Sequence, residues 1–300
     1  MPETISNEPL TVCSAAEDNY AMGLTVAVVS VLKHAPKTSV PVRLVILDGG
    51  IQPKNWLRFE QSIARATTKV EIQRIRPDLS TFEGFKRDYG NSCMTYARLL
   101  LPKLLPDTGR LLYFDSDLVV TRSWKPLWEM NLGENLLSAA VCQQVQTIGQ
   151  GGLPLDDLGL DPCGRYLQAG FMLVNLNAWR HADFDEQCIR YLKRFPNHAP
   201  NWDQSAINAT VDGRWIELNR AWNTPAGFYE EAIPRGADLP AVIHFSGPYK
   251  PWQYGIHRWK SARAFYDLLD ETAWRGWRPS TLRHFARQLK WRAGKLLGKW

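Results

Sequence analysis

Two aspartates stand two positions apart in the segment RLLYFDSDLVV, residues 110–120, directly after a run of apolar residues. Side chains at positions i and i+2 of an extended segment point to the same side, so Asp115 and Asp117 can face one point. Two carboxylates at such a short distance require a cation between them, or a raised pKa for one of them. Most D-x-D pairs are acidic, solvated turns, but the position at the end of a buried strand favours a metal site here.

A second apolar segment supplies a third candidate ligand. VIHFSGPYKPW, residues 242–252, is apolar up to His244 and then continues into Gly247 and Lys250. Mixed carboxylate and imidazole ligands suit Mn²⁺ better than Mg²⁺, although Mg²⁺ stays open as the alternative. Gly247 allows the backbone to approach a phosphate, and Lys250 offers it a point charge. A lone histidine is more often a core residue, so it is the combination that predicts a metal-diphosphate site.

Apolar periodicity indicates the elements that must position these residues. It predicts strands within residues 10–16, 42–48, 69–76, 110–120, 136–141, 169–176, 214–218 and 241–245. Helices are predicted over residues 20–33, 53–66, 95–105, 178–195, 203–211 and 257–270. Alternating strands and helices imply an α/β fold with a mainly parallel central sheet and right-handed crossovers. Such sheets bind ligands beyond the carboxyl ends of their strands, where the two aspartates are expected.

The composition is that of an ordinary soluble globular protein, since 45% of the 300 residues are hydrophobic and 22% are charged. The first ten residues lack the features of a secretory signal, and the apolar run at 24–32 is too short to span a bilayer. We therefore expect a cytoplasmic protein. Five scattered cysteines without a C-x-x-C pair are expected to be reduced packing residues: Cys13, Cys93, Cys142, Cys163 and Cys188.

The net charge of +6 is concentrated at the C-terminus. Residues 271–300 carry eight Lys or Arg against one acid, so the first 270 residues are nearly neutral and do not suggest nucleic-acid binding. We divide the chain into a catalytic domain at 1–270 and a tail at 271–300. The tail shows a basic amphipathic helical pattern with Trp274, Trp277, Trp291 and Trp300, which is typical of an in-plane anchor on an anionic membrane surface. A solvated helix docked on the body is the alternative.

Five ordered motifs resemble glycosyltransferase family 8. They are AAEDNY (15–20), YFDSDLVV (113–120), QAGFMLVNLNAW (168–179), NWDQSAIN (201–208) and HFSGPYKPW (244–252). The sequence is similar to bacterial lipopolysaccharide glycosyltransferases, including α-galactosyltransferases. This resemblance implies a GT-A fold, a UDP-sugar donor, a Mn²⁺-type cation and a glycan acceptor in lipopolysaccharide or other cell-surface glycan synthesis. It also implies retention of the anomeric configuration.

The resemblance also assigns residues to parts of the site. The metal ligands would be Asp115, Asp117 and His244. The remaining donor-binding positions would be Ala15, Glu17, Asn19, Tyr20, Arg98, Ser116, Gln168, Ala169, Asp203, Gly247 and Lys250, with Asn19 and Tyr20 at the uridine and Gly247 and Lys250 at the pyrophosphate. The catalytic positions facing the transferred sugar would be Arg98, Asp203 and Gln204.

Retention raises a mechanistic question. A double displacement needs a carboxylate nucleophile, whereas Gln204 is an amide. We therefore favour a front-side substitution in which UDP leaves as the acceptor hydroxyl enters from the same face. Gln204 would stabilise the oxocarbenium-like sugar and Asp203 would bind its hydroxyls, unless Asp203 serves as the N-cap of the following helix.

Several positions depart from the family pattern, namely Glu17, Cys142, Gln168 and Ser205, and they leave the donor sugar open. Two other functions stay open. A haloacid-dehalogenase-like phosphatase would use Asp115 as nucleophile, but 114 residues precede it where that class starts with its D-x-D strand. A catalytically silent nucleotide-sugar-binding protein is the third alternative. Tail and family together predict a lipid-linked acceptor and an enzyme peripheral on the inner face of the cytoplasmic membrane.

Overall fold

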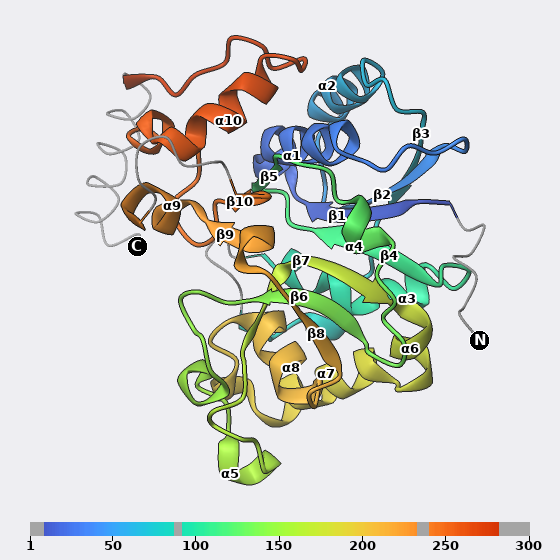
Figure 1. The fold of residues 1–300 in the computed structure, drawn as a ribbon, viewed down its shortest axis with the longest axis vertical. Helices are drawn as coiled ribbons and strands as arrows, with labels where there is room; N and C mark the ends of the chain where they lie inside the picture. The colour runs from blue at the N-terminus through green and yellow to red at the C-terminus, as the bar shows by residue number, and fades with distance from the viewer. Residues whose placement is uncertain (1–8, 87–91, 233–239, 282–300) are drawn as a thin grey trace.

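A large mixed sheet forms the centre of the protein (Figure 1). The computed structural model describes residues 9–86, 92–232 and 240–281. Within them the sheet has the strand order β3-β2-β1-β4-β7-β6-β8. Its strands are β1 (Thr11–Ala16), β2 (Val42–Asp48), β3 (Val70–Ile75), β4 (Arg110–Phe114), β6 (Leu137–Val141), β7 (Leu167–Asn175) and β8 (Trp215–Leu218). β7 runs antiparallel to both of its neighbours, and the other pairings are parallel.

A second, small sheet joins β5 (Leu118–Val120), β10 (Val242–His244) and β9 (Thr224–Pro225). β5 pairs antiparallel with β10, so His244 lies opposite Leu118. The expected strand over 110–120 is therefore two strands in two different sheets. Asp115 and Asp117 lie in the turn where the chain passes from one sheet to the other.

Helices cover both faces of the large sheet (Figure 1). On one face lie α1 (Ala21–Lys33), α2 (Pro53–Ile63) and α10 (Lys260–Leu269), and on the other α6 (Leu176–His181), α7 (Phe184–Arg194) and α8 (Trp202–Thr210). Shorter helices are α3 (Leu101–Leu104), α4 (Lys125–Trp128), α5 (Leu155–Leu158) and α9 (Ala226–Ala232). The 3-10 helices are η1 (Asp18–Tyr20), η2 (Ser80–Phe82), η3 (Met94–Leu100), η4 (Ile148–Gly151), η5 (Pro196–His198), η6 (Arg220–Asn223) and η7 (Ile256–Arg258).

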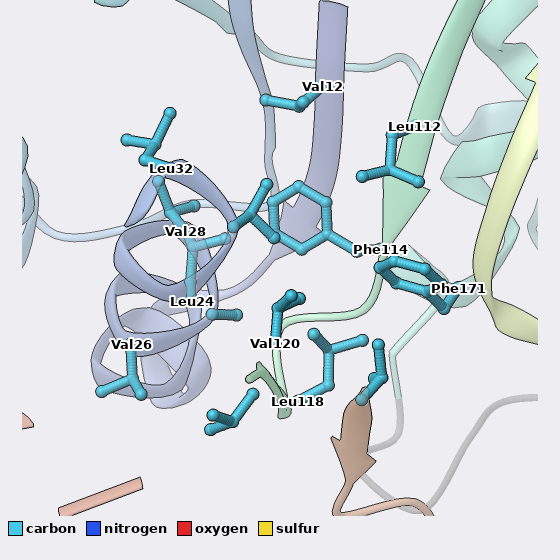
Figure 2. Close-up of a cluster of buried hydrophobic side chains, with 14 of the residues drawn as sticks. Val12, Leu24, Val26, Val28, Leu32, Leu112, Phe114, Leu118, Val120 and Phe171 are labelled. Carbon is cyan, nitrogen blue, oxygen red and sulfur yellow. The ribbon is translucent and has the colours of Figure 1, made fainter. Parts of the chain in front are cut away.

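The strands bury alternate residues in two cores. Val12, Leu112 and Phe114 pack with the predicted apolar stripe of α1, including Leu24 and Val28, as Figure 2 shows. Their chain neighbours, such as Cys13 and Tyr113, enter the core on the helical face formed by η3 and α6–α8. Full burial of an aliphatic or aromatic side chain contributes about 1.5–3 kcal/mol, so the two cores hold the strand ends in place.

Most expected elements are present, with three corrections. Residues 95–105 do not form one helix but the 3-10 helix η3 followed by the short α3, where Pro102 occupies the first turn. The helix expected over 178–195 is two helices, because Asp183 adopts a left-handed backbone (φ 47°) between α6 and α7. Cys163 is exposed rather than a packing residue, while all five cysteines carry free thiols.

The chain stays packed against the body beyond residue 270. Glu271 pairs with Lys33 of α1 at 2.7 Å, and the Ala273 amide donates to the Ser62 hydroxyl of α2 at 3.0 Å. Trp274 is only 6% exposed, so this side chain, expected in the membrane anchor, packs in the core instead. Residues 282–300, with the rest of the predicted amphipathic helix, lie outside the described residues. Within the described ranges, no helix has the length and apolar character to cross a membrane.

Candidate active site

The predicted metal ligands come together at the junction of the two sheets. Ligand atoms of Asp115, Asp117 and His244 all lie within 4.8 Å of one another. The His244 Nε2 atom is 3.2 Å from Asp117 Oδ1 and 3.6 Å from Asp115 Oδ2. Two backbone hydrogen bonds explain the placement. The Asp115 amide donates to the carbonyl of Gly170 in β7 at 2.7 Å, and the Phe245 amide donates to the Asp117 carbonyl at 2.9 Å. Each aspartate is thus held by a different sheet.

A chain of buried amides sets the orientation of His244. The Gly170 amide donates to Gln168 Oε1 at 2.6 Å, and a backbone N–H can only donate. Gln168 Oε1 also accepts a hydrogen bond from Asn223 Nδ2 at 2.5 Å. This bond turns Asn223 Oδ1 toward His244 Nδ1, which lies 2.8 Å away. His244 therefore carries a proton on Nδ1 and points Nε2 at the aspartates. This is how metal-binding histidines are usually oriented.

Gly170 leaves room for the ligand cluster. A Cβ atom at this position would lie 2.4 Å from His244 Cε1 and 2.5 Å from Asp115 Oδ2, which no ordinary contact permits. The two carboxylates, the oriented imidazole and this glycine fit a divalent cation with mixed oxygen and nitrogen ligands. The glycine of the QAGF motif is a site residue that the sequence analysis did not single out.

Arg98 binds Asp115 from the face of the large sheet that η3 and α6–α8 cover. Its Nη2 donates to Asp115 Oδ1 at 2.8 Å, its Nε lies 2.9 Å from Asp203 Oδ2, and its Nη1 donates to the Ala169 carbonyl. Burial opposes the charge, but the two carboxylates raise the pKa of the guanidinium further above its usual value. Burial raises the pKa of Asp203 to about 6, although Arg98 and the Thr95 hydroxyl oppose this shift.

Lys250 binds Asp117 from the C-terminal side. Its ammonium contacts Asp117 Oδ2 and donates to the Phe245 carbonyl at 2.9 Å. Burial acts to raise the pKa of Asp117, but Lys250 and His244 outweigh it and hold this pKa well below its usual range. Paired carboxylates need either nearby positive charge or a raised pKa. At Asp117 nearby positive charge stabilises the carboxylate, and its pKa is not raised.

One cavity is lined both by Asp115 with its partner Arg98 and by Asp117 with its partner Lys250, and it offers a place for a ligand. It has a volume of about 480 Å³ and extends from the end of β1 to the start of α8. The predicted residues that line it are Ala15, Glu17, Tyr20, Arg98, Asp115, Ser116, Asp117, Gln168, Ala169, Asp203, Gln204, His244, Gly247 and Lys250.

Comparison with known proteins identifies the family. The model of the family described as Glycosyl transferase family 8 matches residues 11–255. This chain belongs to glycosyltransferase family 8. As a member of that family it is a glycosyltransferase, which overturns the phosphatase alternative.

Relatives of this family 8 enzyme come from several bacteria. General stress protein A of Bacillus subtilis (strain 168) is 27% identical over 261 residues, covering 82% of this chain and 88% of that protein. The lipopolysaccharide 1,3-galactosyltransferase of Salmonella typhimurium is 24% identical over 251 residues, covering 81% and 72%. The crystal structure of the galactosyltransferase LgtC with donor and acceptor sugar analogs has a TM-score of 0.73 at 27% identity, covering 88% of this chain and 96% of LgtC. The GT-A fold expected from the sequence is confirmed.

Two expectations for the family 8 site are corrected, and one stays a prediction. Asn19 is exposed in η1 and is not among the described residues that line the cavity, whereas Tyr20 lines it, so the contact of Asn19 with the uridine stays a prediction. Asp203 is not the N-cap of α8, since Asn201 takes that position and Asp203 lies in the first turn. Ser205 departs from the family pattern without changing the cavity wall, because it is buried and accepts a hydrogen bond from the Asn201 amide at 3.0 Å.

Other lining residues had no signal in the sequence. They include Ser92, whose hydroxyl donates to Glu17, and Gln144, Trp202, Ser246 and Tyr249. Cys142 does line the cavity, so this departure from the family pattern changes the wall itself. Trp202 has a positive φ of 52°, which is rare for a bulky residue. Asn223 lies one step behind the cavity and could not be recognised before its contact with His244 was known.

Proposed function

We propose that this family 8 protein is a metal-dependent retaining glycosyltransferase that moves a hexose from a UDP-sugar to a glycan acceptor. The observation that carries the proposal is the cluster of Asp115, Asp117 and His244 at the wall of one cavity. Mn²⁺ suits this donor set, and Mg²⁺ is the alternative. When bound, the cation supplies positive charge to the departing diphosphate.

The chain's own residues divide the remaining work. Lys250 and Gly247, with its φ of 73°, lie where a diphosphate would meet the cavity wall. Glu17 and Tyr20 lie at the end of β1, the expected nucleotide side. The Ala169 amide donates to Gln204 Oε1 at 3.0 Å and so holds the amide at the sugar side of the cavity. Preorganised groups of this kind lower the barrier without reorganising during the reaction.

The position of Asp203 supports a front-side substitution over a covalent intermediate. Its carboxylate is 3% exposed, and its two oxygens face Thr95 and Arg98. A nucleophile in a double displacement must instead reach the anomeric carbon. We infer that the acceptor hydroxyl attacks from the face that UDP leaves and passes its proton to the departing phosphate. A glycosyl adduct trapped on Asp203 would contradict this mechanism.

A thermal-shift panel tests the donor and the metal together. Wild type and Asp117→Ala are each measured with UDP, UDP-glucose, UDP-galactose and UDP-N-acetylhexosamines, with and without Mn²⁺. A ligand at a hundredfold excess over its Kd stabilises the native state by about 2.7 kcal/mol. We expect a Mn²⁺-dependent shift that is lost in the variant and is largest for one sugar. The absence of a shift with every UDP compound would refute the donor class, and an unchanged Asp107→Ala would serve as the matched control.

The relatives favour galactose as the first sugar to test. Salmonella lipopolysaccharide 1,3-galactosyltransferase and LgtC are both galactosyltransferases by name. The anomeric configuration of the product, read by NMR, tests retention independently of the sugar. An inverted product would refute the retaining mechanism and leave the transferase assignment in place.

We further propose a lipid-linked acceptor and an anionic membrane surface as partners, through the basic segment 282–300. Six Lys or Arg in this segment support the proposal, since each adds about 1 kcal/mol near such a surface. Co-sedimentation with phosphatidylglycerol vesicles should retain the full chain and not a chain ending at residue 281, which keeps the buried Trp274. Equal sedimentation of both chains would exclude the anchor.

A further inference from the structure

We propose that the Lys250 ammonium and the divalent cation compete for the Asp117 carboxylate. In the metal-free protein Lys250 holds Asp117 in place, and the cation releases Lys250 into the cavity. This inference rests on the proposed metal site. It gives Lys250 a positioning role that is separate from any contact with a phosphate.

The contacts of Asp117 show why the two cations exclude each other. Its side chain lies in a buried position where Oδ2 contacts Lys250 Nζ and Oδ1 faces His244 Nε2 at 3.2 Å. Both oxygens are therefore engaged before a metal arrives. A buried carboxylate that loses its partner is strongly destabilising, so Lys250 stabilises the metal-free site. A cation held by this carboxylate would have to displace the ammonium, because two positive charges cannot occupy the same position.

Arg98 on the neighbouring Asp115 does not exchange in the same way. It is tied to Asp203 and to the Ala169 carbonyl as well, so releasing Asp115 would leave it where it is. Lys250 has the Phe245 carbonyl at 2.9 Å as a second acceptor and the Tyr20 ring at 5.7 Å. Its flexible four-carbon stem lines the cavity, so the ammonium can turn from Asp117 toward a bound anion.

The competition makes cation and diphosphate bind cooperatively. The cation alone must displace Lys250 and so binds more weakly than its ligand set allows. A diphosphate that binds the released ammonium offsets this loss. By linkage, each ligand then raises the affinity of the protein for the other by the same factor. A lysine that served only as a phosphate contact would leave the metal affinity of the nucleotide-free protein unchanged. The two roles therefore make opposite predictions.

Mn²⁺ titration of the nucleotide-free full chain tests the competition. Free Mn²⁺ is measured by electron paramagnetic resonance for wild type, Lys250→Met and Lys69→Met. We expect Lys250→Met to bind Mn²⁺ at least about fivefold more tightly, the lower range for coupled ligands. Lys69 is exposed just before β3, an edge strand of the large sheet, so its variant controls for the lost charge and should match wild type. An equal or weaker Mn²⁺ affinity in Lys250→Met would overturn the proposal.

A second measurement uses only wild type and so does not depend on the folding of a variant. An amine-reactive reagent labels the protein, and mass spectrometry follows Lys250 with Lys69 as the internal reference. Mn²⁺ alone should speed labelling of Lys250 severalfold, and Mn²⁺ with UDP should slow it again. If saturating Mn²⁺ leaves the labelling of Lys250 unchanged or slower, the competition does not occur.

The outcomes separate this inference from the proposed function. Mn²⁺ binding that is lost in Asp117→Ala but equal in wild type and Lys250→Met would refute the competition and keep the metal site. Wild-type protein that binds no Mn²⁺, with or without UDP, would refute the metal-dependent function and the competition together.

Discussion

The two aspartates of the D-x-D motif are neighbours in sequence but belong to two differently built clusters. Asp115 is fixed to β7 of the large sheet and bound by Arg98, which also binds Asp203 and the Ala169 carbonyl. Asp117 is fixed to the small sheet and bound by Lys250, which has fewer anchors. The first cluster is cross-linked to the helical layer, whereas the second is the one in which we propose that a cation is exchanged. The motif thus joins a rigid side at Asp115 to a side at Asp117 that has fewer anchors.

Removal of Arg98 should break the rigid side and have the largest effect on stability. Arg98→Met leaves Asp115 and the buried Asp203 without their shared cation, and losing one partner of a buried ion pair costs about 3–5 kcal/mol. Urea unfolding measures the free energy change. Arg43→Met is the matched control, because Arg43 pairs with the exposed Asp107 and such pairs contribute less than about 1 kcal/mol. Equal losses in both variants would contradict the comparison.

Neutralising Asp117 should affect activity more than stability. Asp117→Asn removes a metal-ligating charge, and we expect kcat/KM for sugar transfer to fall about 10²–10³-fold, as for the loss of one electrostatic group in a transition state. Steady-state kinetics with the UDP-sugar that gives the largest thermal shift provides the measurement. Asp107→Asn, at an exposed position of the same residue type, should retain wild-type rates. Full activity of Asp117→Asn would place the reaction elsewhere.

The pH dependence of stability should reveal the buried carboxyl on the rigid side. Burial raises the pKa of Asp203 to about 6, above the value of about 3.9 for an unfolded aspartate. Folding therefore favours the protonated form, and this stabilisation is fully present below pH 4 and lost as the pH rises through about 6. The difference in unfolding free energy between wild type and Asp203→Asn should fall by about 2–3 kcal/mol from pH 4 to pH 7. A constant difference would show that Arg98 keeps Asp203 ionised throughout.

Loss of Asn223 should weaken metal binding more mildly. Asn223→Ala removes the acceptor that places the proton on His244 Nδ1, and such outer partners are worth about 10- to 100-fold in metal affinity. We expect the Kd for Mn²⁺ to rise about 10-fold, the lower end of this range, since Asp115 and Asp117 keep their positions. Asn219→Ala, in the same segment but capping η6, should bind Mn²⁺ as wild type does. Identical affinities in both variants would mean that His244 keeps its orientation without Asn223.

The sequence could predict much of this protein because local patterns carry it. The apolar runs of β1, β2 and β4, which are buried on both faces, and the apolar residues of α1 can be recognised within each segment by itself. The five motifs led to the family, and Asp115, Asp117 and His244 were grouped because each lies at the end of an apolar segment, although His244 reaches the aspartates through the small sheet.

Only the tertiary structure decided how these residues are held. The crossing from the large to the small sheet, the amide chain from Gly170 through Asn223 to His244, and the choice of Arg98 and Lys250 as partners join segments far apart in sequence. Trp274 was misplaced because it packs in the core with the end of the body instead of with the basic segment that follows it. Such contacts depend on which surfaces meet after the chain packs, and no local pattern records that.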